Sequence, residues 1–313
     1  MADYDVVIIG SGLAGLTGAL LTARCGLSTL VLEANIPGGH LISIEKIEDF
    51  PGFPGGIAGY ELCPNVQRQA ADQGAEFQRA EVRCLEPEGR FWSVLTSEER
   101  HRAKAVIVAT GSTVKKLGVP GEAKLSGKGV SHCASCDGPL YKGKVVGVVG
   151  GGDSALQEAL ALASYADRVI IFQDSESFSA QHVYQERVLA QPKIEVHYQT
   201  VIDEVAGDNE VAGARARHVI TGEKFQVDLS ALFVYVGLAP STGFLKNTLR
   251  LSDTGHVPTD VWMRTERPGL YAVGDIRQES ARQAITSAGE GAVAAIAAQR
   301  YIKHMFRGDC EQI

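Results

Sequence analysis

The 313-residue chain carries 30 Lys and Arg against 37 Asp and Glu, a formal net charge of −7, and 45% of its residues are hydrophobic. This length and composition suit two compact, folded domains and exclude a disordered chain. The acidic balance without basic clusters excludes nucleic acid as a partner. Since no apolar run approaches eighteen residues and the N-terminus lacks a basic leader, we expect no membrane span, no export signal and a cytoplasmic location.

The chain opens with a predicted strand, helix and strand, at residues 5–9, 13–25 and 28–32. The first turn reads Gly10-Ser11-Gly12-Leu13-Ala14-Gly15, and Glu33 follows the second strand. In this context the glycines permit a tight turn, a close approach to a pyrophosphate and close helix packing, and the acid can bind a ribose hydroxyl. The pattern therefore predicts a dinucleotide site.

The same pattern recurs later in the chain, with a strand, helix and strand predicted at residues 145–149, 155–165 and 168–172. Its turn, Gly150-Gly151-Gly152-Asp153-Ser154-Ala155, is a GxGxxA loop. The interval that leads from Gly10 to Glu33 leads from Gly150 to the neutral Gln173, with Asp174 next. We therefore predict an α/β fold with two Rossmann-like, three-layer nucleotide-binding domains.

Three further segments are predicted to return to the first domain: a strand within residues 105–111, a strand within 269–275, and a helix after Arg282-Gln283-Ala284. The helix is rich in glycine and alanine. Small side chains would let its N-terminus come close to a bound cofactor.

Two of the six cysteines, Cys133 and Cys136, form a CxxC motif shortly before the second glycine loop. A dithiol beside two dinucleotide loops indicates flavoprotein disulfide chemistry. The alternative is half of a zinc site, but a structural zinc needs four ligands and the chain has no second CxxC or spaced His pair. We expect no metal. The other cysteines are interpreted as packing residues or, at the tail, an exposed incidental thiol: Cys25, Cys63, Cys84 and Cys310.

The order of these motifs resembles the low-molecular-weight thioredoxin reductases over nearly the whole chain, one domain being inserted in the other. The matching segments are the two glycine loops, Pro37-Gly38-Gly39, Glu48 to Pro54, Ala109-Thr110-Gly111, Cys133 to Gly138, Gly274-Asp275 and Arg282-Gln283-Ala284. The resemblance implies a discontinuous FAD-binding domain (1–113 and 244–313) and an inserted pyridine-nucleotide-type domain with the CxxC (114–243). It also implies hinges at Ser112-Thr113 and Ala239-Pro240-Ser241, and a homodimer.

The resemblance further assigns roles to individual residues. Cys136 would exchange electrons with the flavin, Cys133 would attack the disulfide of thioredoxin, and Asp137 would act as the acid-base group. It assigns these residues to FAD: Gly10, Ser11, Gly12, Ala14, Gly15, Glu33, Ala34, Gly38, Gly39, His40, Leu41, Asp49, Val82, Ala109, Thr110, Gly111, Gly274, Asp275, Arg282, Gln283 and Ala284.

One departure from the family concerns the electron donor. NADPH-dependent members place a His-Arg-Arg cluster and a further Arg where this chain has Gln173, Asp174, Ser175 and Ser179. Losing several charge-assisted contacts, each worth about 1.5–3 kcal/mol, would weaken NADPH binding by orders of magnitude. We therefore doubt NADPH and expect a ferredoxin-type or unidentified donor.

Other readings stay open. One alternative is an NADH- or NADPH-dependent thioredoxin reductase, and the intact Gly150–Gly152 loop favours NADH as its donor. A second alternative is a dithiol oxidase, which would use the same FAD and CxxC to oxidise a small dithiol and pass its electrons to oxygen. A third is a flavin-binding regulatory protein, which would have no catalytic turnover. His40, where relatives carry Gln, could tune the flavin, but we favour a simple hydrogen bond. His132 could favour a thiolate on Cys133 or lie at the surface.

Overall fold

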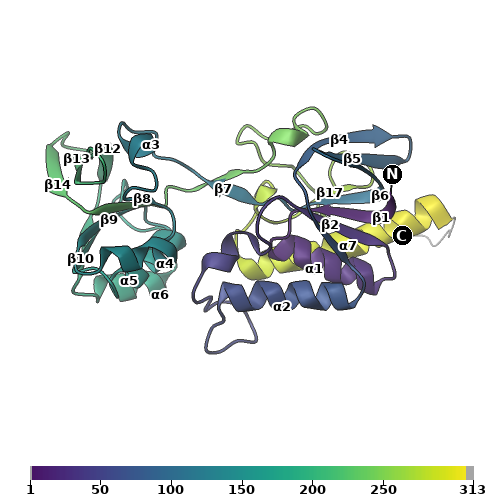
Figure 1. Cartoon of the computed structure of the whole chain (residues 1–313), viewed down its shortest axis with the longest axis horizontal. Coiled ribbons are helices and arrows are strands. Elements are labelled where there is room, and N and C mark those ends of the chain that lie inside the picture. Colours follow the sequence, from purple (N-terminus) through teal and green to yellow (C-terminus); the bar gives the residue numbers. More distant parts are fainter. Residues whose placement is uncertain (1, 308–313) are drawn as a thin grey trace. The chain divides into compact units, whose positions relative to one another are not determined.

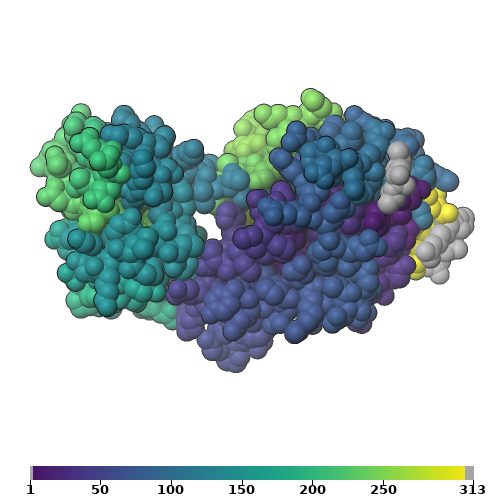
Figure 2. All heavy atoms as spheres, viewed as in Figure 1, coloured from purple at the N-terminus to yellow at the C-terminus, as the bar shows by residue number. Residues whose placement is uncertain are grey.

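The computed structural model describes residues 2–307 of the chain. It divides into two compact units, one formed by Met1–Thr113 together with Ala239–Ile313 and the other by Val114–Leu238. In Figure 2 the N-terminal part of the chain, in purple, and the C-terminal part, in yellow, belong to the same unit. No helix among the described residues is long and apolar enough to cross a membrane.

The first unit is built on a seven-stranded sheet with the order β3-β2-β1-β6-β5-β4, and β17 also pairs with β6. Its β1, β2, β3, β6 and β17 run parallel, whereas β4 and β5 are antiparallel additions. The strands are β1 (Ala2–Ile9), β2 (Thr29–Glu33), β3 (Glu76–Arg79), β4 (Val82–Glu88), β5 (Phe91–Thr96), β6 (Arg100–Val108) and β17 (Leu270–Ala272).

Both faces of this sheet are covered, as the continuous apolar run in β1 predicts. Val6 and Ile8 pack with the helices, and Val7 and Ile9 pack with the β4–β5 hairpin and Leu245. The helices are α1 (Leu13–Arg24), α2 (Gly59–Asp72) and α7 (Ala284–Ile302), which lie together on one face (Figure 1). Short turns complete the unit: η1 (Gly39–Ser43), η3 (Gly243–Leu245), η4 (Gly274–Ile276) and the π-helical η5 (Lys303–Arg307).

The second unit contains a five-stranded parallel sheet, order β11-β10-β9-β15-β8, and a three-stranded antiparallel sheet, order β12-β13-β14. The strands are β8 (Val130–Ser131), β9 (Val145–Val149), β10 (Arg168–Phe172), β11 (Ile194–His197), β12 (Thr200–Ala206), β13 (Gly213–His218), β14 (Lys224–Asp228) and β15 (Ala231–Val234). Its helices are α3 (Glu122–Leu125), α4 (Ala134–Asp137), η2 (Gly138–Tyr141), α5 (Asp153–Leu162) and α6 (His182–Leu189).

Two core clusters again sandwich the parallel sheet of this unit. Val146 and Val148 of β9 pack with α4, α5 and α6, whereas Val149 packs with the antiparallel sheet. Where the chain passes between the units, β7 (Ser112–Val114) pairs with β16 (Leu238–Pro240).

The predicted α/β class with two Rossmann-like sheets is confirmed. One helix boundary was wrong, because α5 begins at Asp153 and ends at Leu162 instead of covering 155–165. After Leu162 the chain tightens into a turn, in which the Ser164 and Tyr165 amides donate to the Ala161 and Leu162 carbonyls (3.1 and 2.9 Å). The Ala163 and Ala166 carbonyls accept hydrogen bonds from the Lys193 ammonium (3.1 and 2.9 Å).

Candidate active site

The first glycine loop joins β1 to α1, and at two of its positions only glycine fits. Gly10 has a φ of +97°, and a Cβ there would overlap the Ala109 carbonyl. A Cβ at Gly15 would overlap the Gly10 carbonyl, so the helix approaches the loop as closely as backbone allows. Gly12 is the N-cap of α1, and a Cβ added there would meet no atom within 4 Å.

Glu33, at the end of β2, is tied to this loop. Its Oε2 accepts hydrogen bonds from both the Ser11 amide and the Ser11 hydroxyl, each at 2.7 Å, and its Oε1 accepts one from the Asn35 amide (2.9 Å). The carboxylate is therefore held at the rim of the turn, with the exposed Ala34 beside it.

Three distant segments meet at this loop. The Gly38 amide donates to the Ser11 carbonyl (2.9 Å), and the Ala109 amide donates to the Ile9 carbonyl (2.7 Å). Gly274 lies against Ala14, where a Cβ would be 3.3 Å from the alanine methyl group. The sequence motifs around residues 38, 109 and 274 therefore form one cluster with the glycine loop.

His40 belongs to the same cluster. Its Nε2 lies 2.6 Å from the Ser112 carbonyl oxygen, which can only accept, so Nε2 carries the proton. The Ser112 hydroxyl in turn donates to Asp275 Oδ2 (3.3 Å). This hydrogen bond joins η1 to the segment that follows Ala109-Thr110-Gly111, and the role of His40 toward a flavin stays a prediction.

The remaining expected FAD residues take several positions. Leu41 and Ala284 pack in one small core with Leu13 of α1, and Val82 packs in the core beneath β2. Gln283 is the N-cap of α7, and Arg282 before it has a left-handed φ of +55°. Asp49 lies on the exposed loop between η1 and α2.

The second glycine loop repeats the backbone of the first. The Gly150 amide donates to the Phe172 carbonyl (3.0 Å), as the Gly10 amide does to the Leu32 carbonyl (2.8 Å). Gln173 therefore occupies the position of Glu33. It is only 6% exposed and packs against Gly151, and its Nε2 donates to the Ser177 carbonyl (3.0 Å).

The residues after Gln173 form an exposed segment with acidic and hydroxyl side chains. The Asp174 carboxylate accepts a hydrogen bond from the Ser175 hydroxyl (2.9 Å), and the Ser179 hydroxyl donates to the Gly151 carbonyl (3.4 Å). From 173 to 181 the sequence includes no Lys or Arg.

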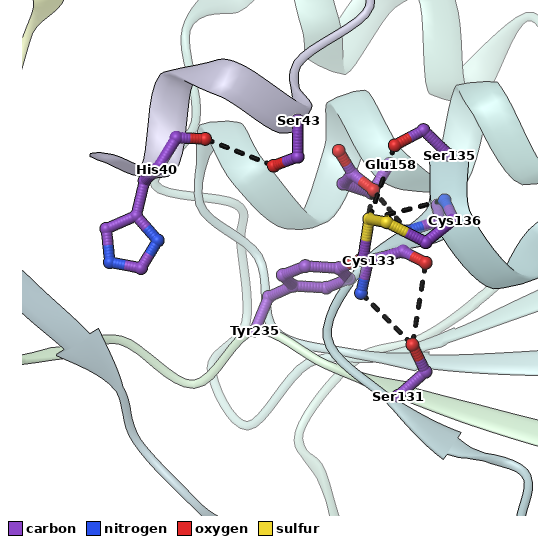
Figure 3. The surroundings of a disulfide bond; sticks show 9 residues. His40, Ser43, Ser131, Cys133, Ser135, Cys136, Glu158 and Tyr235 are labelled. Atoms are coloured by element: carbon purple, nitrogen blue, oxygen red, sulfur yellow. Dashed lines mark hydrogen bonds between the residues drawn. A yellow bond between two sulfur atoms is a disulfide. The ribbon is translucent and has the colours of Figure 1, made fainter. Parts of the chain in front are cut away.

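Cys133 and Cys136 form a disulfide with a Cα–Cα distance of 5.3 Å (Figure 3). Cys133 is the N-cap of α4, and its Sγ accepts the Cys136 amide (3.2 Å) and lies 3.3 Å from the Ser135 hydroxyl. The Cys133 amide donates to the Ser131 hydroxyl (3.1 Å). An N–H directed at a sulfur stabilises a thiolate there, which suits Cys133 as a nucleophile.

The neighbours of the disulfide carry further polar groups. Asp137 is half-buried, and its amide donates to the Cys133 carbonyl (3.1 Å). Burial, and secondarily the Asp137 charge, raise the pKa of Tyr141. His132 donates from Nδ1 to the Val234 carbonyl (2.9 Å), which fixes the orientation of its ring.

Two residues beside the disulfide were missed by the sequence analysis. Glu158 Oε2 accepts hydrogen bonds from the Ala134 amide (2.7 Å) and from the Tyr235 hydroxyl (3.1 Å). Burial, then the nearby Glu158, raise the pKa of Tyr235, so the phenol remains a neutral donor. The sequence did contain a signal for Glu158, because it lies at helical spacing among the buried Ala155 and Leu162.

The isolated cysteines differ from one another. Cys63 is buried, and burial raises its pKa to about 11, as expected for a packing residue. Cys25 is exposed, so its assignment to packing was wrong, and Cys84 is half-buried. Cys25 follows the last turn of α1, where the chain turns at the surface through Gly26. Cys310 lies outside the described residues. Among residues 2–307, no group of three or more His, Cys, Asp and Glu side chains is placed to hold a metal ion.

Comparisons with known proteins agree with this architecture. Residues 4–291 match the family model described as pyridine nucleotide-disulphide oxidoreductase. Thioredoxin reductase of Streptomyces coelicolor is 42% identical over 306 residues, which covers 96% of this chain and 95% of that protein. The crystal structure of Lactococcus lactis thioredoxin reductase superimposes with a TM-score of 0.95 at 37% identity, covering 96% of this chain and 100% of the other.

A more distant match bears on the electron donor. The structure of a ferredoxin-flavin thioredoxin reductase from Clostridium acetobutylicum matches with a TM-score of 0.53 at 30% identity, covering 97% of this chain and 99% of the other.

Two Rossmann-like sheets and a CxxC disulfide define a disulfide oxidoreductase of the flavoprotein class. Within that class, the chain belongs to the low-molecular-weight thioredoxin reductase family. It is a thioredoxin reductase-like FAD-dependent disulfide oxidoreductase, and its redox-active disulfide is Cys133–Cys136.

The first unit has the groups that FAD requires. The N-terminus of α1 has neither a side-chain cap nor an acid in its first turn, so its N–H groups can face a pyrophosphate. Glu33 keeps accepting capacity for a ribose hydroxyl, because a carboxylate offers about four lone-pair sites. These residues fit the cofactor that the family implies.

Proposed function

We propose that this protein reduces thioredoxin with electrons that enter its FAD from a donor other than NADPH, either a ferredoxin-type protein or an unidentified one. The observation that carries the proposal is the end of β10, where the neutral Gln173 and the exposed Asp174 follow the strand. A 2′-phosphate requires cationic side chains at this point, and a carboxylate would repel it.

The two units have separate tasks in this proposal. The discontinuous part, 1–113 and 244–313, binds FAD through the cluster around the Gly10–Gly15 loop, and the inserted part, 114–243, carries the redox pair. Bound FAD supplies two electrons at a time. Two electrons and two protons convert the Cys133–Cys136 disulfide into two thiols, with Cys136 facing the flavin and Asp137 moving the protons.

Substrate reduction then proceeds by thiol–disulfide exchange. The Cys133 thiolate attacks one sulfur of the thioredoxin disulfide, which forms a mixed disulfide and releases one thiolate of thioredoxin. Cys136 attacks Cys133 Sγ, which restores the internal disulfide and releases reduced thioredoxin. The N–H from Cys136 to Cys133 Sγ supports this order, since it favours the thiolate on Cys133.

NADH is a second candidate donor, and one observation favours it. The second glycine loop keeps its dinucleotide-binding backbone, with a φ of +128° at Gly150 and no side-chain cap on Gly152. NADH lacks the 2′-phosphate, so Asp174 would not repel it in the same way.

An anaerobic donor titration tests the proposal. Oxidised holoprotein is mixed with NADPH, NADH or a reduced ferredoxin, while flavin bleaching is followed. We expect reduced ferredoxin to bleach the flavin. The rate of bleaching by NADPH should be at least about 100-fold below the rate that turnover needs. Fast bleaching by NADPH would overturn the donor assignment.

Thioredoxin as the substrate is tested separately. Dithionite-reduced holoprotein should transfer one electron pair to oxidised thioredoxin, and Cys133→Ser should abolish the transfer. Oxygen uptake with a small dithiol, without reduction of thioredoxin, would instead identify a dithiol oxidase.

A further inference from the structure

An acid lies within the apolar face of α5 that packs behind the redox disulfide. Glu158 shares this face with the buried Ala155, Ala159 and Leu162. Its carboxylate accepts hydrogen bonds from the Ala134 amide (2.7 Å) and the Tyr235 hydroxyl (3.1 Å). Figure 3 shows Glu158 and Tyr235 beside the disulfide. Placing a carboxylate among apolar residues is costly unless it is hydrogen-bonded, and these two bonds offset part of that cost.

The contact reaches the first peptide of the CxxC helix. Ala134 follows Cys133 directly and is the first residue of α4. Of the amides at this helix start, that of Cys136 donates to Cys133 Sγ, whereas that of Ala134 donates to Glu158. The carboxylate therefore accepts the N–H of the first residue of this four-residue helix. It also holds the peptide that adjoins Cys133.

Tyr235 links this carboxylate to the second glycine loop. The Tyr235 amide donates to the Val149 carbonyl (2.8 Å), and a Cβ on Gly150 would overlap the Tyr235 carbonyl. The Tyr235 backbone is thus fixed at the end of β9, and from there its phenol donates to Glu158.

Other ionisable groups of the second unit adjoin the pair in sequence or contact its neighbours. Asp137 follows Cys136 directly and its charge also acts on Tyr141, His132 precedes Cys133, and Tyr235 donates to Glu158. A carboxylate one peptide from a sulfur disfavours a second negative charge, which would lower the fraction of Cys133 present as thiolate.

We propose that Glu158, held by Tyr235, is a positioning residue that anchors the CxxC helix and, against the N–H that Cys136 directs at the same sulfur, lowers the fraction of reduced Cys133 present as thiolate. Because the thiolate is the species that oxidants attack, a smaller thiolate fraction slows the oxidation of the reduced pair. The inference rests on Cys133–Cys136 as the redox pair. It does not depend on which donor reduces the flavin.

Alkylation of the reduced protein tests the proposal without donor or thioredoxin. Holoprotein reduced with dithiothreitol is freed of reductant under anaerobic conditions and treated with iodoacetamide across a pH series. Peptide mapping then gives separate rates for Cys133 and Cys136. In Glu158→Gln, the amide oxygen can still accept from Ala134 and Tyr235, so the anchor is kept while the charge is lost.

We expect Glu158→Gln to move the pH profile of Cys133 alkylation to lower pH and to raise its rate at neutral pH about tenfold, the effect of about one pKa unit. Glu158→Asp retains the charge with a shorter reach, and its profile should stay close to that of the wild type. Glu186→Gln is the matched control, because it removes an exposed carboxylate of α6 that pairs with His182 (3.2 Å).

An unchanged profile in Glu158→Gln, or an equal shift in Glu186→Gln, would overturn the proposal. If Glu158→Gln folds poorly, Glu158→Asp provides the test. A large shift in its pH profile of Cys133 alkylation, despite the retained charge, would also contradict the proposal. Failure of thioredoxin reduction would not affect these rates, so the two proposals fail independently.

Discussion

The two glycine loops have the same backbone and differ in the residue that follows the second strand. In the first unit, Glu33 accepts hydrogen bonds from the turn through a charged carboxylate. In the second, Gln173 occupies the same place as a buried amide. The glycines are required by the strand–turn–helix geometry whether or not a ligand binds, so they alone do not report the ligand. The strand-end residue is the more informative position.

The largest expected effect separates the two loops directly. Gly12 and Gly152 are both helix N-caps, and an added Cβ would meet no atom within 4 Å at Gly12 and only the Ser179 hydroxyl, at 3.8 Å, at Gly152. The added methyl group of Gly12→Ala should crowd the pyrophosphate and weaken FAD binding by about 1–3 kcal/mol, so the purified protein should lose most of its flavin. Flavin absorbance per protein measures this.

Gly152→Ala carries the same loss of an N-cap glycine and is the matched control. If no dinucleotide binds the second loop, its flavin content and its turnover with a protein donor should equal those of the wild type. A tenfold loss of turnover would place a dinucleotide at that loop.

Restoring positive charge at the end of β10 should make the second loop resemble an NADPH site. In the triple variant Asp174→Arg/Ser175→Arg/Ser179→Arg, each successful contact to the 2′-phosphate is worth about 1.5–3 kcal/mol. We expect NADPH to reduce the flavin at least about tenfold faster than in the wild type, with NADH little changed. Stopped-flow absorbance compares the two, and an equal gain for both would contradict the phosphate explanation.

The converse change makes the first loop resemble the second. Glu33→Gln leaves one acceptor oxygen where the carboxylate now serves Ser11 and Asn35. Replacing a charged acceptor by a neutral one should weaken FAD binding about tenfold. Isothermal titration of the apoprotein measures it, and unchanged affinity would show that the strand-end residue matters less than we infer.

The smallest expected effect concerns the pH dependence of stability in the flavin unit. His101 is 3% exposed, and neither ring nitrogen has a hydrogen-bond partner within the described part of the chain. Burial lowers its pKa, although Glu99, whose Oε2 is 3.5 Å from Nε2, partly opposes this. The unfolded chain therefore binds this proton more readily, and the free energy of unfolding falls as the pH drops below about 6.5.

His101→Leu should remove that loss. The fall in Tm between about pH 7.5 and about pH 5.5 should be smaller than in the wild type by about 2–4 °C. Scanning calorimetry of the holoprotein at both pH values tests this. An equal fall in Tm in the variant and the wild type would mean that a group other than His101 causes the pH dependence.

The sequence predicted the parts of the fold that depend on local pattern. The apolar strands at residues 5–9 and 145–149 and the glycine turns after them each carry their own signal, and all are present. The short strand β17, only Leu270–Ala272, is stabilised mainly by pairing with β6. Its prediction depended on the acid and glycine that follow it.

What the sequence did not predict depends on long-range contacts. Tyr235 and Ala134 lie about a hundred residues apart in sequence, and only the folded sheet brings them to one carboxylate, that of Glu158. The left-handed Arg282 was also missed, because a φ of +55° in a residue other than Gly or Asn has no reliable local signal.

The discontinuity of the first unit has a consequence for biosynthesis. Its β6 pairs with β1 and β5, which precede it in the chain, but over Val106–Val108 it pairs with β17, which the ribosome makes more than 150 residues after β6. The second unit is contiguous, from Val114 to Leu238. Since domains generally fold as they emerge from the ribosome, the second unit can reach its native state during translation. The sheet of the first unit stays incomplete until its last strand and helix have been made. Chaperones would meet the edge of β6 that β17 has yet to cover.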